Sequence, residues 1–173
     1  MKALIVSDSH GATEELQLLR QRYEGIVDVM LHCGDSELPE DHPALQGFQV
    51  VNGNRDLYGS TFQEEYLNEI KGTTIYMVHG HWHGIKYSFK KVANRAKELN
   101  ATIVCFGHSH VREASMVDQV LCINPGSFRF PKRYLEKSYV ILTCDEHTKT
   151  VHFYDKIIKK SISLKFPSKN VLQ

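Results

Sequence analysis

Five short apolar runs of the sequence each end in a cluster of polar residues, and this recurrence limits the folds open to the chain. The clusters are Asp8-Ser9-His10, Gly34-Asp35, GNRD at 53–56, HGH at 79–81 and GHSH at 107–110. Short apolar runs bounded by turn-forming residues are typical of buried strands. Parallel strands of an α/β sheet present their carboxyl ends along one edge, where ligands bind. We therefore expect the five loops to meet in one crevice.

The segments between the clusters predict helices that alternate with these strands. Residues 12–23 carry Leu16 and Leu19 at helical spacing, with Thr13 as a candidate N-cap. Residues 86–100 form a second predicted helix, with an apolar face from Tyr87 to Leu99 and Asn100 at its end. Between them, residues 62–79 indicate a hairpin that turns at 71–72.

Beyond residue 111 the pattern changes to short strands without clear helices. Candidate strands lie at 112–117, 119–127, 138–146 and 150–158, which predicts a second, antiparallel sheet region. The tail, residues 159–173, is basic and contains Pro167, so we expect an edge strand followed by a loose terminus.

Length and composition favour one globular domain over residues 1–173. Twenty-one basic against twenty acidic residues leave a formal charge of +1, which gives no electrostatic footprint for nucleic acid or for an anionic membrane. No apolar stretch reaches the roughly 18 residues of a membrane helix, and the start is unlike a secretory signal. The four cysteines have no CxxC spacing, as expected of reduced, buried thiols. We expect a cytoplasmic protein.

The residue types in the clusters are those that bind divalent metal ions. Asp, His and Asn offer oxygen and imidazole nitrogen, which suit Zn, Mn, Fe or Ni. Seven such ligands exceed one tetrahedral ion and fit two ions that share a carboxylate.

Each cluster alone also has a structural interpretation, because Asp commonly caps helices and Gly and Asn commonly form turns. Chance would have to place such residues at five successive strand ends, which favours the metal site. Three residues within or beside the clusters each have two possible roles. Asp56 either pairs with Arg55 or caps a helix, and His81 and His83 either line the cleft or supply a proton.

The clusters resemble the motifs of calcineurin-like metallophosphoesterases, namely DxH, GD, GN followed by one residue and an acid, H, and GHxH. The NPGS stretch at 124–127 is similar to one found in the small bacterial YfcE-type branch, although NPGS is first of all a turn signal. The resemblance implies an α/β fold, a four-layer α/β/β/α sandwich of two mixed β-sheets flanked by helices.

The resemblance also implies how the ligands divide between two ions. Asp8, His10 and His110 would bind one ion, and Asn54, His79 and His108 the other, with Asp35 bridging them. The expected cofactors are two divalent ions, with Mn²⁺ preferred over Zn²⁺, Fe²⁺ or Ni²⁺.

One position departs from the family pattern. Arg55 stands where many relatives have a histidine proposed to protonate the leaving group. Arginine stays charged and offers a fork of donors, so it suits binding phosphate rather than donating a proton. We expect a phosphodiesterase that hydrolyses a small phosphodiester by in-line attack of a metal-bridging hydroxide. The expected catalytic residues are Asp35, Asn54, His108 and Arg55.

Two rival functions belong to the same fold. A relative in the retromer coat uses it as a non-catalytic scaffold that holds partner proteins, and further members of the family are nucleases. The near-neutral charge argues against a DNA duplex as substrate. The aromatic stretch at 128–134 is a candidate contact for a homodimer.

Overall fold

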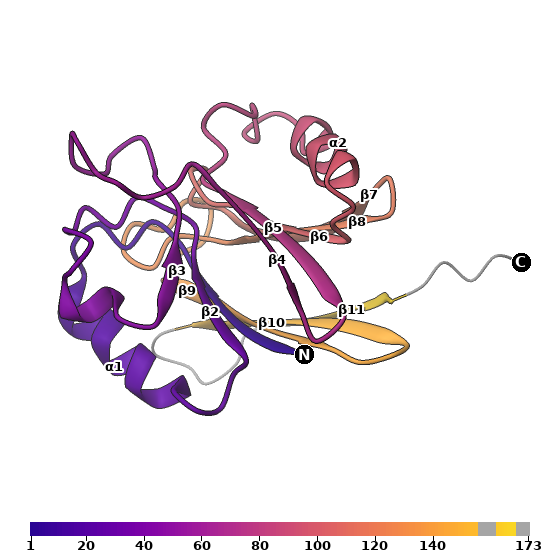
Figure 1. Cartoon of the computed structure of the whole chain (residues 1–173), viewed down its shortest axis with the longest axis horizontal. Helices are drawn as coiled ribbons and strands as arrows, with labels where there is room; N and C mark the ends of the chain where they lie inside the picture. Colours follow the sequence, from indigo (N-terminus) through magenta and orange to yellow (C-terminus); the bar gives the residue numbers. More distant parts are fainter. Residues whose placement is uncertain (156–161, 169–173) are drawn as a thin grey trace, which may run out of the picture.

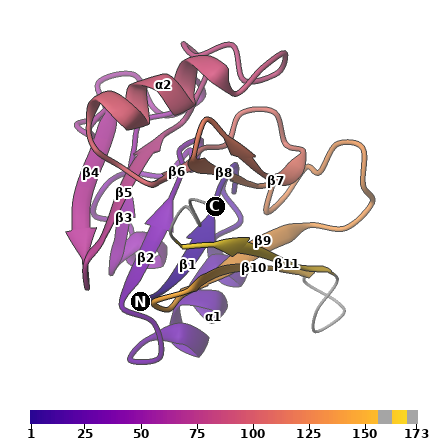
Figure 2. The same ribbon diagram turned by 90° about the vertical axis from the view of Figure 1, so that its right-hand side faces the viewer.

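In the computed structural model, which describes residues 1–155 and 162–168, two β-sheets pack face to face with a helix on each outer side (Figures 1 and 2). The first sheet has the strand order β11-β10-β9-β1-β2-β3, and the second has the order β4-β5-β6-β8-β7. Figure 2 shows the four layers, with α2 over the second sheet and α1 under the first. The predicted four-layer sandwich is confirmed.

The elements follow one another in chain order. They are β1 (Lys2–Val6), α1 (Thr13–Tyr23), β2 (Val29–His32), a 3₁₀ turn (Pro43–Leu45), β3 (Phe48–Val50), β4 (Glu65–Ile70), β5 (Thr73–Val78), α2 (Lys90–Glu98), β6 (Ile103–Cys105), β7 (Arg112–Val117), β8 (Val120–Pro125), β9 (Ser138–Cys144), β10 (Thr148–Asp155) and β11 (Ile162–Pro167).

The alternation of side chains along the strands divides the apolar residues among three clusters. In β1, Ala3 and Ile5 face the second sheet, whereas Leu4 and Val6 pack with the buried side chains of α1. This follows from the two-residue period of a strand. Apolar side chains fill the space between the two sheets, so the polar loops lie outside this core, at the ends of the strands.

The strands beyond residue 111 do not form a separate antiparallel sheet, and that prediction is wrong. β8 pairs parallel with β6 and antiparallel with β7, so this hairpin extends the second sheet. β9 pairs antiparallel with β1 and leads into β10, which extends the first. All six residues of β8 are buried, so its apolar sequence reflects a central position.

The predicted helices are shorter than expected at their starts. Ala12 occupies the N-cap of α1, and Thr13 makes no capping hydrogen bond. α2 begins only at Lys90, and Tyr87, 95% exposed, does not contribute to its apolar face. Asn100 follows the end of α2 with a φ of 56°, in the left-handed conformation that favours Asn after a helix.

The remaining expectations on the tail and the cysteines mostly agree with the structure. β11 lies at the edge of the first sheet, as predicted, and pairs with β10. The rest of the predicted strand 150–158 and the loose terminus lie outside the described residues. All four cysteines are reduced, and three are buried. No helix in the described ranges is long and apolar enough to cross a membrane.

Candidate metal centre

The five polar clusters meet at one end of the two facing sheets, where the strands that precede them have their carboxyl ends. The clusters after β1, β2 and β3 belong to the first sheet, and those after β5 and β6 to the second. Within each sheet, backbone hydrogen bonds join neighbouring loops, from Asp8 N to Gly34 O at 3.0 Å and from Gly107 N to His79 O at 3.0 Å. The backbone N of His108 joins the two sheets, since it donates to Asp8 Oδ2 at 3.1 Å. The predicted convergence on one crevice is confirmed, but the crevice lies between two sheets rather than along one.

Four of the seven candidate ligands form one compact group. Asp8, His10, Asp35 and His110 each offer a ligand atom, and all four atoms lie within 4.8 Å of one another. His110 Nε2 lies 3.1 Å from Asp8 Oδ1 and 3.3 Å from His10 Nε2. The resemblance assigned Asp8, His10 and His110 to one ion and Asp35 to the bridge between the two ions.

The other three candidates lie close to one another and to Asp35. His79 Nε2 lies 3.4 Å from Asp35 Oδ2 and 3.2 Å from Asn54 Oδ1. The rings of His79 and His108 have centroids 5.2 Å apart. Asp35 therefore stands between two sets of donor atoms, where the resemblance placed the bridging ligand.

Hydrogen bonds hold three of the histidine rings with the same nitrogen inward. Nδ1 of His79 donates to Cys33 O at 2.7 Å, and Nδ1 of His110 donates to Phe130 O at 2.7 Å. Nδ1 of His10 donates to Glu37 Oε1 at 3.0 Å. In a neutral histidine this leaves a lone pair on Nε2, and such partners are typical of metal-binding histidines. Glu37 is a supporting residue that the sequence interpretation missed.

The carboxylate of Asp8 fits a cation at this position. Oδ2 accepts hydrogen bonds from Ser7 Oγ at 2.6 Å and from the backbone N of His108 at 3.1 Å. Oδ1 is buried and accepts no hydrogen bond, although His110 Nε2 is nearby. A buried carboxylate oxygen without a hydrogen bond is costly unless a cation lies beside it. Together with the imidazole nitrogens it faces, this oxygen supplies the kinds of ligand atom that divalent ions bind.

Charges within the cluster shift the pKa values in opposite directions. Burial alone would raise the pKa of Asp8, but His110 and His79 outweigh it and hold that pKa below its ordinary value. Burial likewise opposes, but does not prevent, a raised pKa of His79 next to Asp35. His108 differs, since burial, His79 and Lys86 lower its pKa to about 4, which keeps its ring neutral near pH 7.

The loops carry their ligands in an unusual backbone conformation. Asp8, His10, Asp35, His108 and His110 all have φ between 43° and 63°. Asp, Asn and His tolerate this left-handed region better than most residues, and it clusters at functional sites. His108 and His110 therefore do not lie on an extended strand.

Gly107 is required by close packing. A Cβ at Gly107 would lie 1.8 Å from Ser7 Oγ and 2.5 Å from Asp8 Oδ2. The GHSH loop thus approaches the DxH loop more closely than any side chain would permit.

Asp56 fulfils neither of the two roles considered from the sequence. Its Oδ2 accepts hydrogen bonds from the backbone N of Asp35 at 2.9 Å and of Gly53 at 2.8 Å. Its Oδ1 accepts from the backbone N of Glu37 at 2.8 Å and from Ser36 Oγ at 3.0 Å. Asp56 therefore ties the Gly34-Asp35 loop to the GNRD loop. Arg55 pairs instead with Glu37, at 3.3 Å.

The NPGS residues support the loops of the centre. Asn124 Nδ2 donates to Gly107 O at 2.8 Å, and Ser127 Oγ donates to Asp8 O at 2.8 Å. Their role is structural, as the turn interpretation indicated.

In the stretch 128–134, which adjoins NPGS, Phe128 is buried and the Phe130 ring lies 5.4 Å from that of His10. Both rings make contacts within the chain, and the homodimer stays a prediction.

A cleft of about 350 Å³ opens onto the centre. It is lined by His10, Asp35, Glu37, Asn54, Arg55, Lys86, His108, His110, Phe130 and Lys132. His81 and His83 do not line it. The His81 ring lies beside those of His79 and His108, with centroid distances of 5.4 and 6.1 Å. We refer to the cleft of about 350 Å³ as the metal-site cleft.

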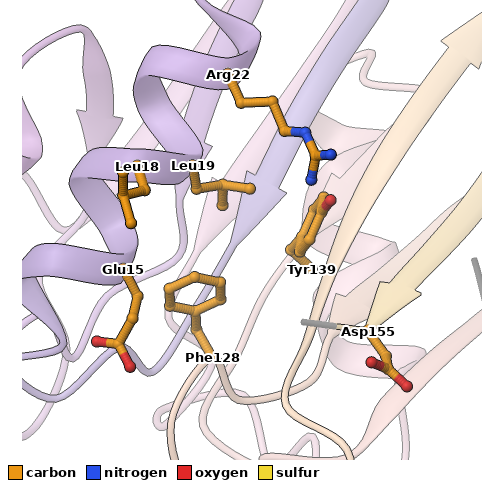
Figure 3. A pocket seen from close by; sticks show the side chains of 7 residues that line it. All are labelled: Glu15, Leu18, Leu19, Arg22, Phe128, Tyr139 and Asp155. Carbon is orange, nitrogen blue, oxygen red and sulfur yellow. The ribbon is translucent and has the colours of Figure 1, made fainter. Parts of the chain in front are cut away.

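A second cavity, of about 200 Å³, lies against α1 and is separate from the five loops. Figure 3 shows its lining, with four side chains from α1 facing Phe128, Tyr139 and Asp155. It shares no lining residue with the metal-site cleft. The candidate ligands are therefore all outside it.

A buried histidine next to the centre gives the metal-free protein a pH-dependent stability. His32 is fully buried, its Nε2 lies 2.8 Å from Ser9 Oγ, and burial lowers its pKa to about 4. The unfolded chain takes up this proton near pH 6.5, so stability is complete above pH 6.5 and decreases as the pH falls toward 4. We expect a loss on the order of 2 kcal/mol from this residue.

Urea unfolding of chelator-treated protein at pH 6.5 and pH 4.5 measures this loss. The variant His32→Gln has no proton to take up, so its free energy of unfolding should change less between the two pH values than that of the wild type. Equal changes in both proteins would contradict the assignment.

The sequence and fold match the calcineurin-like phosphoesterase family. A family model described as a calcineurin-like phosphoesterase superfamily domain matches residues 1–147. The "Probable metallophosphoesterase YsnB" of Bacillus subtilis (strain 168) is 48% identical over 156 residues, which cover 90% of this chain and 92% of that protein. The crystal structure of a conserved, predicted phosphoesterase from Streptococcus pneumoniae TIGR4 is 34% identical, with a TM-score of 0.91, over 96% and 97% of the two chains.

More distant solved structures share the fold. The phosphoesterase Yfce from E. coli has a TM-score of 0.68 at 19% identity, over 95% of this chain and 98% of its own. Vps29 from Entamoeba histolytica, solved in complex with Zn²⁺, has a TM-score of 0.76 at 20% identity, over 96% and 99% of the two chains.

Proposed function

The chain belongs to the calcineurin-like phosphoesterase superfamily, and from this premise we propose that it is a binuclear metal-dependent phosphodiesterase. The observation that carries the proposal is Asp35, which stands between the group of Asp8, His10 and His110 and the group of Asn54, His79 and His108. A carboxylate between two such groups is what a pair of metal ions requires. The proposed substrate is a small phosphodiester.

The donor set fits two divalent ions, and Mn²⁺ is our choice for the assay. The seven candidate ligands would hold two such ions, which would lower the pKa of a water molecule so that it supplies hydroxide and would add positive charge for an in-line displacement at phosphorus. The low pKa of His108 keeps a lone pair available at neutral pH. Glu37, Cys33 O and Phe130 O hold the other imidazoles in their ligating orientation.

We propose that Arg55 binds the phosphate group. Its side chain is 66% exposed, lines the metal-site cleft, and donates from Nε to Glu37. The pair with Glu37 fixes the guanidinium and leaves its two terminal nitrogens for phosphate oxygens. We propose that Arg55 orients the substrate, and that the backbone N of Arg55, which donates to Asp35 Oδ1 at 2.7 Å, links it to the metal centre.

The absence of a proton donor at position 55 predicts a preference among leaving groups. Phosphodiesters with acidic aryl leaving groups should be hydrolysed faster than alkyl monoesters, since an aryl oxide leaves without protonation. Steady-state rates for bis(p-nitrophenyl) phosphate and for glycerol phosphate measure this. Faster hydrolysis of the alkyl monoester would contradict the role assigned to Arg55.

Metal analysis and phosphodiesterase activity test the proposal together. Purified protein should bind about two Mn²⁺ per chain and hydrolyse bis(p-nitrophenyl) phosphate, and chelation should abolish the hydrolysis. Metal binding without hydrolysis of any phosphoester would favour the non-catalytic scaffold. Cleavage of DNA at a higher kcat/KM than small diesters would favour the nuclease.

A further inference from the structure

Three cationic side chains line the metal-site cleft, and the sequence interpretation assigned a role to only one of them. Arg55, Lys86 and Lys132 all border it, against two carboxylates, Asp35 and Glu37. Asp35 faces the metal groups, and Glu37 pairs with Arg55 and with His10. The charges of Lys86 and Lys132 are therefore in excess of the acidic groups of the cleft.

Lys132 is held beside His110 by the loop that carries it. Its backbone N donates to His110 O at 3.0 Å, and two residues earlier Phe130 O accepts from His110 Nδ1 at 2.7 Å. In the same loop, Arg129 Nη1 donates to His10 O. The loop is thus fixed to both histidines of the first metal group, and the exposed side chain of Lys132 extends from a fixed position at the rim.

Lys86 is held on the side of His108 by its neighbour in the chain. Ile85 is only 3% exposed and packs in the apolar cluster of α2 with Phe106, the residue that precedes the GHSH loop. The side chain of Lys86 is exposed and lines the cleft, and its charge acts on the ring of His108. The two lysines therefore flank the centre, one beside each histidine of the GHSH loop.

The charge of the cleft exceeds what a simple phosphodiester neutralises. Asp8, Asp35 and the proposed hydroxide supply three negative charges against the four positive charges of two divalent ions. A phosphodiester brings one negative charge, and Arg55 is already paired with Glu37. Within residues 1–155 and 162–168, Lys86 and Lys132 form no ion pair of their own. Two ammonium groups are left for a further anionic group.

We infer that Lys86 and Lys132 form a subsite for a second phosphate, so that the preferred substrate is a phosphodiester that also carries a phosphomonoester. The inference rests on the proposed phosphodiesterase function. Lysine suits this task, because its long stem and three donors reach a phosphate whose position varies with the substrate. A dianionic phosphate near two ammonium groups and away from the ions would lower KM and leave the chemical step unchanged.

A matched pair of substrates tests the subsite. The p-nitrophenyl ester of thymidine 5′-phosphate and the same compound with a 3′-phosphate differ only in the second phosphate. With Mn²⁺-loaded wild type, kcat/KM should be roughly tenfold higher for the 3′-phosphorylated compound, mainly through KM. The double variant Lys86→Gln/Lys132→Gln should reduce this ratio to about one. Lys97→Gln, an exposed lysine on α2, removes a charge elsewhere and should keep the ratio.

Binding measurements separate the subsite from the proposed function. Calorimetry should show tighter binding of thymidine 3′,5′-bisphosphate than of thymidine 5′-phosphate to the wild type, with a difference that decreases at high salt and in the double variant. If the diesters are not hydrolysed but this difference is present, the phosphodiesterase proposal fails and the anion subsite stands. If they are hydrolysed with equal kcat/KM and the nucleotides bind equally, the subsite is overturned.

Discussion

Replacing Asp35 by asparagine is expected to lower kcat/KM for bis(p-nitrophenyl) phosphate on the order of 10³-fold. The carboxylate stands between the two metal groups, with Oδ2 3.4 Å from His79 Nε2 and Oδ1 accepting from Arg55 N. Asparagine has the same shape and can still accept from Arg55 N, but it lacks the charge that holds two cations together. The loss should therefore appear in metal content, with a fall from about two Mn²⁺ per chain to one or none.

Two measurements make this prediction specific. Metal content by mass spectrometry and thermal unfolding of the chelated proteins should show that Asp35→Asn is folded and depleted in metal. Asp41→Asn, an exposed acid in the connection between β2 and β3, removes the same charge and should keep both metal and activity. Wild-type activity in Asp35→Asn would refute the binuclear assignment.

Asp56→Ala is expected to lower the free energy of unfolding by about 3 kcal/mol. The carboxylate accepts four hydrogen bonds, three of them from backbone N–H groups of the two loops that present Asp35 and Asn54. Without the carboxylate, those of the four donors that are buried have no hydrogen-bond acceptor, and the two loops are free to separate. We expect weaker Mn²⁺ binding as well, although Asp56 is not a candidate ligand.

The geometry of these bonds predicts a graded response. Each carboxylate oxygen serves two donors, so Asp56→Asn keeps one acceptor oxygen and should lose roughly half as much stability as Asp56→Ala. Urea unfolding measures the free energies, and Asp41→Ala provides an exposed reference. An Asp56→Ala protein with wild-type stability would show that these hydrogen bonds are dispensable.

Much of the fold follows from local sequence, and the errors have identifiable physical causes. The strands that end in polar clusters were predicted because apolar runs and turn residues are local signals. The pairing of β9 with β1 was not predicted, because this pairing joins segments far apart in the chain and depends on which faces of the strands become buried. The start of α2 at Lys90 was also missed, since Tyr87 has the type of a core residue but is exposed.

For the candidate site, the sequence by itself determined the chemistry of the donor atoms. Asp, His and Asn at the strand ends supply oxygen and imidazole nitrogen whatever the fold, which is why the ligand candidates were identifiable before the structure. Only the tertiary structure decided which atoms face one another. His10 meets His110, and Glu37 rather than Asp56 pairs with Arg55, because two packed sheets bring distant loops together. Distances between loops depend on packing, which no single loop sequence contains.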